Sequence, residues 1–407
     1  MEGVEVCSLF DATANVNPFA LASFSREKWE YMALFDTERW YDELPQWTFP
    51  TWFLALSVDE GRALVAYFQR NVLGRRGGEV FTEKHRRDLA GLKERLDSVM
   101  QQQQEEENDG GECGGDGCYF VRLSSRSPKD VGLNGDHPQI LTSLRQELDR
   151  LNATSVNDKL RALQTAVGRV LKVSTAEAAL SLIGTSERTY TDLLHYLEDE
   201  SSWKMKVVIR RWVDGIDVGN EYRGFVCCDQ LTALCQYNDL CFYPALVGNE
   251  EKVVEGIVDV WLKARERLNL LYQAYIIDFV IVGTSVYIIE INPFGPMTGA
   301  SLFDWKLDRK LLQGGANLWF EEESPKEEEE PEEVELNPNV LQMTFNVAEQ
   351  KKPLYFRRLK NDLPLDASYL EAYPLFRMLS SNKGNEEAVK EAEGEKEDRS
   401  KSKCITC

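Results

Sequence analysis

The sequence has few or none of the signatures that mark several large classes of protein. It contains three histidines, His85, His137 and His195, and none falls in a motif, so histidine catalysis is not indicated. The phosphate-loop pattern G-x-x-x-x-G-K-[ST] and the kinase patterns H-R-D and D-F-G are absent, which excludes those two classes of nucleotide-binding protein. No apolar run has the length of a membrane span, and residues 1–20 lack a basic start followed by an apolar run. We therefore expect neither a membrane helix nor a secretory signal.

The net charge of -21 is concentrated in two segments, and the rest of the chain is only mildly acidic. Residues 321–335 hold ten glutamates and one lysine, and residues 105–116 hold six acids and no base. Like charges at this density oppose compact packing, so we expect both acidic segments to be disordered. Because the remaining chain has no surplus of basic residues, direct binding of nucleic acid through a basic face is not expected.

Nine cysteines are scattered along the chain without the spacing of a metal site. Cys113 and Cys118 lie in a glycine-rich acidic stretch that has no second cysteine pair and no nearby histidine, so zinc is not expected. Cys404 formally fits a prenylation box, but the polar Thr406 and the acidic residues before it disfavour that modification. Free thiols are typical of a reducing compartment, and we expect a soluble, cytoplasmic protein without stable membrane association.

The periodicity of apolar residues predicts alternating helices and strands, which is typical of an α/β (α+β) protein. After an aromatic helix-then-strand unit at 22–72, helices are expected over 82–100, 138–172, 175–199 and 250–267, and strands over 118–123, 206–213, 222–228 and 231–237. We expect an amino-terminal lobe at 20–205, which contains a low-complexity insert at 101–117 and a helical insertion at 138–172. A second lobe is expected at 206–320. An acidic linker at 321–336, a further segment at 337–381 and a disordered tail at 382–407 should follow.

The most informative segment is a predicted hairpin, YIIDFVIVGTSVYIIEINPF, whose apolar strands are interrupted by Asp278, Glu290 and Asn292. If Val282 pairs with Val286 across a three-residue loop, the two acids stand directly opposite each other and the amide shares their face. At roughly 5 Å and an effective dielectric near 20, their repulsion is about 3 kcal/mol. A divalent cation would remove it, and a small set of oxygen ligands suits Mg²⁺ completed by phosphate oxygens. A four-residue loop, or an exposed hairpin edge, would leave no such role.

Three clusters of cationic side chains flank strands in the central part of the chain. They are FVRLSSRSPKD with Arg122, Arg126 and Lys129, VVIRRW with Arg210 and Arg211, and EYRGFV with Arg223. Arginine and lysine beside hydroxyls suit a polyphosphate, and Trp212 could wall a flat base. Each cluster alone is equally compatible with surface cations that neutralise local acids. Together with the acidic hairpin, however, they predict the two complementary halves of a nucleotide pocket.

These motifs also carry a resemblance to a known family. RLSSRSPKD, VVIRRW, EYRGFV followed by Gln236, and IIDFVIV…YIIEINPFGPMTGASLFDW resemble the motif series of the cell division cycle protein 123 family, as does TERWYDELPQWTFPTWFLAL nearer the amino terminus. The resemblance implies a two-lobed, ATP-grasp-like fold that holds ATP and Mg²⁺. It also implies a chaperone that assembles eukaryotic translation initiation factor 2 and engages its gamma subunit.

The resemblance further implies which residues bind the cofactors. Asp278, Glu290 and Asn292 match metal-ligand positions, and Arg122 stands where relatives usually carry a phosphate-contacting lysine. The other implied nucleotide contacts are Ser124, Ser125, Ser127, Lys129, Arg210, Arg211, Trp212, Arg223 and Gln236. The segment at 210–212 would link the lobes beside the adenine.

Two further interpretations stay open. ATP-grasp folds commonly activate a carboxylate and join it to an amine, so the chain could be a ligase with the same pocket. It could also be a degenerate scaffold, which the presence of all three implied metal ligands disfavours. The sequence identifies no acceptor-binding or catalytic residue, so an assembly chaperone is preferred and enzyme activity stays uncertain.

Overall fold

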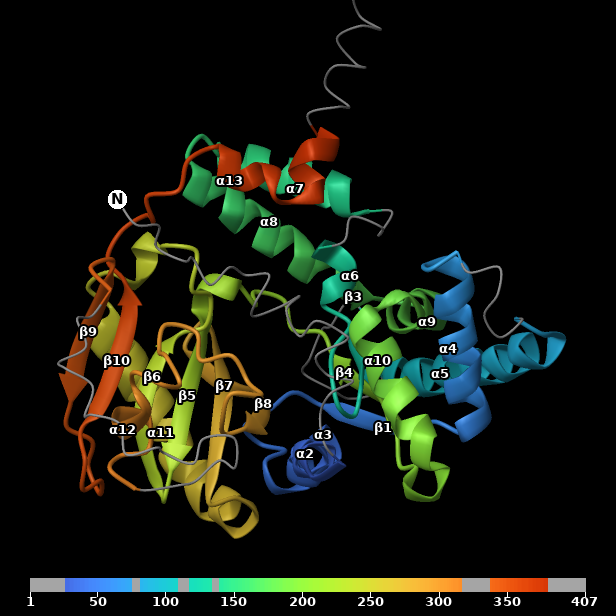
Figure 1. The fold of residues 1–407 in the computed structure, drawn as a ribbon, viewed down its shortest axis with the longest axis horizontal. Coiled ribbons are helices and arrows are strands. Elements are labelled where there is room, and N and C mark those ends of the chain that lie inside the picture. Colours follow the sequence, from blue (N-terminus) through green and yellow to red (C-terminus); the bar gives the residue numbers. More distant parts are fainter. Residues whose placement is uncertain (1–25, 75–80, 109–116, 134–138, 317–336, 380–407) are drawn as a thin grey trace, which may run out of the picture. The chain divides into compact units, whose positions relative to one another are not determined.

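A computed structural model of the chain describes residues 26–74, 81–108, 117–133, 139–316 and 337–379. The chain divides into two compact units, the first formed by residues 1–131 and 171–363 and the second by residues 132–170 and 364–407. Both β-sheets lie in the first unit, and helices accompany each of them (Figure 1). The predicted α+β class is therefore confirmed.

The smaller sheet is antiparallel and has the strand order β1-β4-β2-β3. Its strands are β1 (Thr51–Ala55), β2 (Tyr119–Leu123), β3 (Lys172–Val173) and β4 (Lys206–Arg211). The helices that accompany it are α4 (Val58–Asn71), α5 (Glu83–Asn108), α9 (Ala176–Thr185) and α10 (Glu187–Tyr196). Tyr119, Val121 and Leu123 belong to one apolar cluster with residues of these helices. Because side chains alternate along a strand, Arg122 lies on the opposite face of the sheet.

Helix α5 is longer than the sequence predicts. It continues through the glutamine- and glutamate-rich stretch to Asn108. The Gln104 side chain donates a hydrogen bond to the carbonyl of Gly117 at 3.0 Å, and the Tyr119 hydroxyl donates to the carbonyl of Met100 at 2.9 Å. The first part of the predicted disordered insert is thus helical, because glutamine and glutamate are good helix formers. Residues 109–116 lie outside the described residues.

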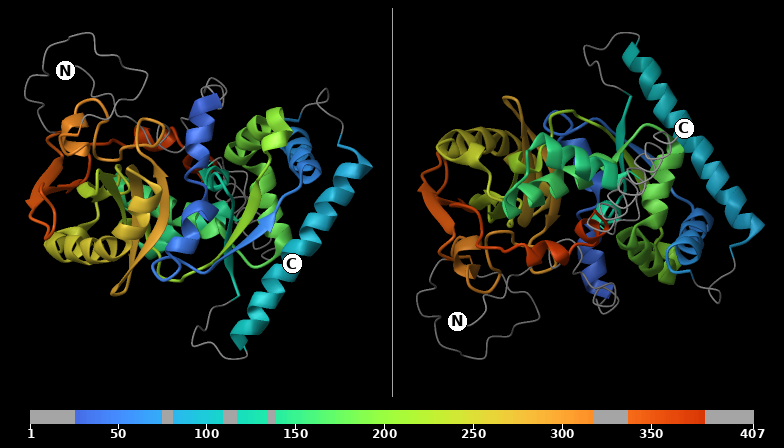
Figure 2. Two further views of the ribbon diagram at one scale, coloured as in Figure 1. Left: turned by 90° about the horizontal axis from the view of Figure 1, so that it is seen from below. Right: turned by 90° about the horizontal axis from the view of Figure 1, so that it is seen from above.

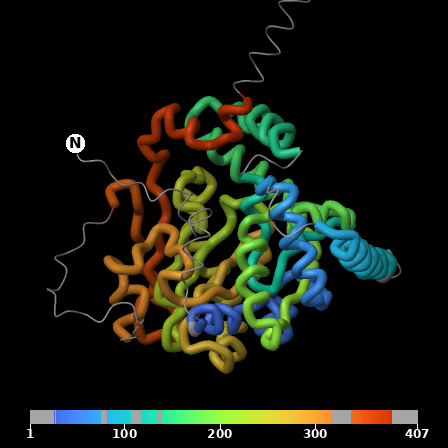
Figure 3. The backbone as a smooth tube through the Cα atoms, turned by 45° about the vertical axis from the view of Figure 1, so that its right-hand side comes forward, coloured from blue at the N-terminus to red at the C-terminus, as the bar shows by residue number. Residues whose placement is uncertain are grey.

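The larger sheet has the strand order β8-β7-β5-β6-β10-β9. Its strands are β5 (Glu221–Cys227), β6 (Gln230–Gln236), β7 (Ala274–Val282), β8 (Ser285–Pro293), β9 (Val340–Phe345) and β10 (Leu354–Leu359). All neighbouring pairs are antiparallel except β10 with β6, which are parallel. Figure 3 shows this edge of the sheet, where the orange-red strands of residues 340–359 lie beside the yellow-green strands.

The two faces of the larger sheet are covered by different parts of the chain. Helix α11 (Glu250–Leu271) packs on one face of the sheet (Figure 2). Its Trp261 and Leu268 join an apolar cluster with strand residues. The other face is covered by the segment after β8, which includes Phe303 and α12 (Arg309–Leu312). The hairpin acid Asp278 and Arg223 lie on this second face, since both follow the alternation of its cluster residues.

The predicted segment 337–381 supplies strands β9 and β10 to the same sheet as residues 206–320. Two ion pairs tie β10 to the rest of the unit. Arg358 Nε donates to Glu250 Oε1 at 2.6 Å, and Arg357 Nη1 donates to Asp308 Oδ2 at 2.6 Å. Both arginines are buried.

The amino-terminal part of the first unit contacts strand β8. It comprises α2 (Arg26–Ala33), α3 (Thr37–Trp40), η2 (Tyr41–Glu43) and the loop that follows. The backbone amide of Ile288 donates to the carbonyl of Trp47 at 2.7 Å, and the Thr48 hydroxyl donates to the carbonyl of Ile288 at 2.7 Å. These bonds satisfy backbone groups at the outer edge of the larger sheet.

The second unit contains helices α7 (Ile140–Arg150) and α8 (Val156–Val170), which are in contact, and α13 (Ser368–Glu371). The helical character predicted for 138–172 is therefore confirmed over these two helices, while Lys172 belongs to β3. The remaining short elements of the chain are α6 (Asp130–Leu133), η3 (Leu197–Ser202), η4 (Val218–Asn220) and η5 (Pro244–Leu246).

Among the described residues, no helix combines the length and apolar character that a membrane span requires. The predicted linker 321–336 and the tail 382–407 lie outside the described residues.

Candidate functional site

The hairpin formed by β7 and β8 brings the two acids together by a different register from the predicted one. Val282 pairs with Ser285 rather than with Val286, so the predicted three-residue loop is wrong and the turn is one residue shorter. A bulge next to Asp278 then shifts the register by one residue. Asp278 therefore does lie directly opposite Glu290, as the sequence predicted.

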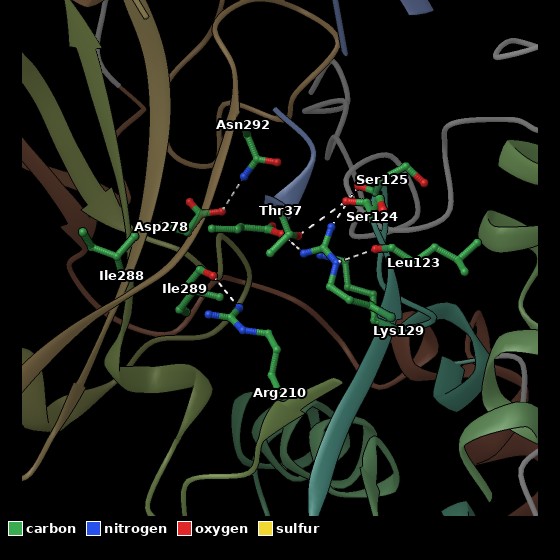
Figure 4. Close-up of polar contacts among 12 residues, drawn as sticks. Thr37, Leu123, Ser124, Ser125, Lys129, Arg210, Asp278, Ile288, Ile289 and Asn292 are labelled. Carbon is green, nitrogen blue, oxygen red and sulfur yellow. Dashed lines mark hydrogen bonds and ion pairs between the residues drawn. The ribbon is translucent and has the colours of Figure 1, made fainter. Parts of the chain in front are cut away.

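Asp278 is held by two neighbouring side chains. Its carboxylate accepts two hydrogen bonds from Arg223, from Nε and Nη2, both at 2.8 Å. A third comes from Asn292 Nδ2 at 3.1 Å, and Figure 4 shows this contact. Burial raises the pKa of the Asp278 carboxyl, and the charge of Arg223 opposes that shift. The predicted common face of Asp278 and Asn292 is confirmed by their contact.

Glu290 has its own arginine, which comes from the smaller sheet. Arg122 Nη1 donates to Glu290 Oε2 at 2.6 Å. Burial disfavours the charged form of Glu290, but the positive charges of Arg122 and Lys129 outweigh this effect and lower its pKa to about 2. Each acid of the hairpin is thus paired with an arginine, so their mutual repulsion is compensated within the chain.

The oxygen atoms of this cluster fit a hard cation such as Mg²⁺. Glu290 Oε1 and Asn292 Oδ1 accept no hydrogen bond from a described residue. Glu290 pairs with Asp278 across the hairpin, and the Asn292 amide donates to the Asp278 carboxylate. Oxygen ligands of this kind are the ones that Mg²⁺ prefers. Within the described ranges, no three His, Cys, Asp or Glu side chains are grouped as metal ligands. A metal here would therefore depend on the amide of Asn292 together with the two acids.

The loop after β2 is fixed by hydrogen bonds of its own side chains. Arg122 Nη2 donates to the carbonyl of Ser125 at 2.8 Å. The Ser124 hydroxyl donates to Glu38 Oε1 at 3.0 Å, and the Ser125 hydroxyl donates to Asp192 Oδ2. The two hydroxyls that the resemblance assigns to phosphate binding are therefore bonded to acidic side chains in this structure.

Lys129, at the end of the same loop, lies close to the larger sheet. Its Nζ donates to the Tyr237 hydroxyl at 2.8 Å. The guanidinium carbon of Arg223 lies 4.7 Å from the centre of the Tyr237 ring. Tyr237 thus connects two of the predicted phosphate contacts. Ser127, two residues before Lys129 in the same loop, is half-buried.

Arg210 lies on the same face of the smaller sheet as Arg122, but its hydrogen bonds are internal. Its Nη1 donates to the carbonyl of Ile289 at 2.6 Å (Figure 4). Its Nη2 donates to the Thr48 hydroxyl at 2.6 Å. Burial and the nearby charge of Arg122 lower the pKa of Arg210. Arg210 therefore ties strand β4 to strand β8 and to the loop before β1.

Arg211 lies on the other face of the smaller sheet. Trp212 follows the alternation of Arg210, because its backbone amide donates to the carbonyl of Cys118 and so continues the pairing of β4 with β2. The guanidinium carbon of Arg211 is 5.7 Å from the centre of the Trp52 ring. Trp212 packs against the apolar cluster of the helices, and its Nε1 donates to Asp214 Oδ1 at 3.2 Å. The structure does not bring these two residues to the hairpin acids.

Gln236 is also directed away from the hairpin acids. It is buried, its Oε1 accepts a hydrogen bond from the backbone amide of Leu359 at 2.9 Å, and its Nε2 donates to the carbonyl of Cys241 at 2.9 Å. Tyr222, which pairs with Gln236, belongs to the apolar cluster under α11. Gln236 therefore connects β6 to β10, and its neighbour Tyr237 faces the cluster of charged residues instead.

The structure adds residues to this cluster that the sequence motifs did not identify. They are Tyr237, Asp192, Arg188 and Glu221. Burial raises the pKa of Glu221 to about 7, and Asp278 and Glu290 add to this shift while Lys129 opposes it. Tyr237 directly follows a predicted contact, but Arg188 and Asp192 lie in an ordinary amphipathic helix, whose pattern carries no signal of a site.

A comparison with protein-family models assigns the chain. The model called D123 matches residues 162–369, which is about half of the chain. The chain belongs to the D123 family. The match includes the hairpin acids, Arg223 and the strands β9 and β10, and it begins after the loop that carries Arg122.

The curated relatives of this D123 protein are distant. Cell division cycle protein 123 of Eremothecium gossypii is 28% identical over 197 residues, which cover 45% of this chain and 54% of the relative. A translation initiation factor eIF2 assembly protein of Danio rerio is 26% identical over 201 residues, which cover 48% of this chain and 53% of the relative. The chain thus spans about half the length of the curated relatives it matches.

Among solved structures, Cdc123 of Schizosaccharomyces pombe is similar to the chain at 19% sequence identity. The superposition covers 69% of this chain and 92% of that chain, with a TM-score of 0.45.

Proposed function

We propose that the chain is an assembly factor for eukaryotic translation initiation factor 2 that binds Mg²⁺ and ATP in an ATP-grasp-like fold. The observation that carries the assembly role is family membership, because D123 relatives such as that of Danio rerio are named eIF2 assembly proteins. We propose the gamma subunit as the part of the client that the chain contacts.

The nucleotide part of the proposal rests on the charged cluster. Strand β2, the loop that follows it and strand β5 contribute Arg122, Lys129 and Arg223 around the acids of the hairpin. Arginine and lysine side chains bind phosphate oxygens, and carboxylate and amide oxygens bind Mg²⁺. Three neighbouring groups of contacts contain both kinds of side chain, namely Arg122 with Glu290, Arg223 with Asp278 and Asn292, and Lys129 with Tyr237.

Each residue would have a defined task in such a site. Glu290 and Asn292 would hold the metal with Asp278, whose orientation Arg223 fixes by two hydrogen bonds. Mg²⁺, when bound, neutralises phosphate charge and orients the phosphate oxygens. Arg122, now bonded to Glu290, would be able to bond a phosphate oxygen in its place, since a guanidinium has five N–H donors.

Calorimetric titration of the chain with ATP, with and without Mg²⁺, tests the nucleotide part. We expect Mg²⁺-dependent binding that Asn292→Ala weakens at least about tenfold, which corresponds to about 1.4 kcal/mol. Asn269→Ala is a matched control. The Asn269 amide also donates a hydrogen bond to an aspartate, Asp229, but Asn269 lies near the end of helix α11 and not in the hairpin. Absence of Mg²⁺-dependent binding to the unaltered chain would contradict the proposal.

Quantitative affinity purification from a native extract tests the assembly part. We expect the gamma subunit of initiation factor 2 to be recovered in a defined ratio to the chain. Recovery of a ligated small-molecule product, without a protein client, would instead favour the ATP-grasp ligase.

A further inference from the structure

Arg188 is the one arginine around this cluster whose guanidinium bonds no described residue. It lies near the start of helix α10, and its Nη1 atom is completely buried without a hydrogen-bond partner. The side chain as a whole is half-buried. A buried donor without a partner is costly, so a native structure keeps one only where something else compensates the loss.

The other arginines of the region differ from Arg188 in this respect. Arg122 donates to Glu290, Arg223 to Asp278, and Arg210 to a backbone carbonyl. Arg126 donates to Asp192 through Nε at 2.9 Å. Glu290, Asp278 and Asp192 are thus engaged by other arginines, and no described residue accepts a hydrogen bond from the Arg188 guanidinium.

The backbone of Arg188 is nevertheless firmly held. Asp130 accepts hydrogen bonds from the backbone amides of Glu187 at 2.7 Å and of Arg188 at 3.4 Å. Its other oxygen accepts from the Ser186 hydroxyl at 2.6 Å. In addition, Arg126 Nη2 donates to the carbonyl of Arg188 at 2.9 Å. These hydrogen bonds hold the main chain of Arg188 in place, which reduces the conformational entropy lost when its guanidinium binds a ligand.

The electrostatic surroundings of Arg188 connect it with the hairpin acids. Burial lowers the pKa of its guanidinium, and the charge of Arg126 lowers it further. Asp130, Tyr237 and Glu290 act in the opposite direction. The contacts of the main chain agree with this, because Arg126, which donates to the carbonyl of Arg188, belongs to the same loop as Lys129 and directly follows Ser125, whose carbonyl bonds Arg122.

We infer that Arg188 is a further ligand for the polyphosphate chain of the nucleotide, donating hydrogen bonds to phosphate oxygens beside Lys129 and Glu290. This inference rests on the proposed binding of ATP and adds a contact that neither the sequence motifs nor the resemblance includes. A polyphosphate fits this position because it supplies several acceptor oxygens and negative charge to a donor that has neither.

The test is titration of Arg188→Gln and Arg188→Lys with Mg-ATP, Mg-tripolyphosphate and adenosine. Arg188→Gln loses hydrogen bonds between an ionised donor and an ionised acceptor. Its affinity for Mg-ATP and for Mg-tripolyphosphate should therefore be roughly 10- to 100-fold weaker than that of the unaltered chain. Arg188→Lys should lie between this variant and the unaltered chain, because it keeps the charge but loses the planar fork. Any binding of adenosine should be unchanged. Arg62→Gln is the matched control, since it removes one charge from an exposed arginine on α4.

Thermal melting without nucleotide separates a ligand contact from a structural one. Since Arg188→Gln removes no side-chain hydrogen bond of the described structure, its melting temperature should equal or exceed that of the unaltered chain. A lower melting temperature, or undiminished affinity for Mg-ATP in this variant, would overturn the inference while leaving the proposed function standing. No Mg-ATP binding by the unaltered chain would instead overturn the proposed function, and this inference with it.

Discussion

Replacing Asp278 by alanine should destabilise the chain even in the absence of any nucleotide. Asp278 is 2% exposed and Arg223 is 6% exposed, and two hydrogen bonds of 2.8 Å join them. The substitution removes the carboxylate and leaves a buried guanidinium without its counter-charge. From the sequence alone, the opposite result is expected, because two facing acids repel and removal of one would relieve the strain.

The loss of stability in Asp278→Ala depends on which contacts of Arg223 remain in the variant. Removing one partner of a buried ion pair costs about 3–5 kcal/mol. Arg223 retains a hydrogen bond to the carbonyl of Gly299 and the contact with the Tyr237 ring. Asn292 also loses its acceptor, but it is half-buried and can bond water. We therefore expect a loss of about 3 kcal/mol, at the lower end of that range.

Urea denaturation followed by circular dichroism measures this loss. The double variant Asp278→Leu with Arg223→Leu removes both charges, and replacing a buried pair by apolar residues is often close to neutral. It should therefore be more stable than Asp278→Ala alone. If Asp278→Ala were as stable as the unaltered chain, the argument from the ion pair would be wrong. If the double variant were less stable than both single variants, the pair would not be the source of the effect.

Three further predictions follow from other charged groups. Because the pKa of Glu290 is lowered from 4.5 to about 2, its contribution to stability is complete above pH 4.5 and is lost as the pH falls towards about 2, so Glu290→Gln should reduce the acid dependence of the unfolding free energy. The pKa of Glu221 is raised from 4.5 to about 7, so stability should decline as the pH rises through that interval, and Glu221→Gln should abolish the decline in the same assay. Arg358→Leu leaves the buried Glu250 carboxylate without its partner and should cost about 3–5 kcal/mol, measured by chemical denaturation.

The position of the acids opposite each other could be predicted from the sequence, but its structural cause could not. The strand propensities of the two apolar runs, and the glycine between them, identify a hairpin. The two-residue turn alone would have shifted the acids out of register, and the bulge beside Asp278 restores it. A bulge depends on the local twist and packing of the whole sheet, which a single sequence does not reveal.

The motifs located charged side chains correctly but could not tell which face of a sheet each would occupy. Arg210 and Arg211 are adjacent, yet only Arg210 lies on the face of Arg122. Gln236 and Tyr237 differ in the same way. Because the faces alternate at every residue, an error of one position reverses the assignment. Partners distant in sequence, such as the acids that bond the loop serines, leave no local pattern.

Strand β10 shows why the sequence alone does not predict the full extent of the larger sheet. Its sequence LYFRRL contains two adjacent arginines, which is typical of an exposed segment. Both arginines are buried because Asp308 and Glu250, which lie earlier in the chain, neutralise them. Their ion pairs involve separations in sequence that no local pattern encodes.

The parallel pairing of β10 with β6 has a practical consequence for producing shortened forms of the protein. A version that stops soon after the hairpin would retain all three implied metal ligands, but β6 would lose its neighbour and present an unpaired row of backbone groups. Gln236 would lose the backbone amide that it bonds, and the Glu250 carboxylate would lose its arginine. Such a fragment should aggregate through its new edge. A minimal soluble form therefore has to extend through Leu359.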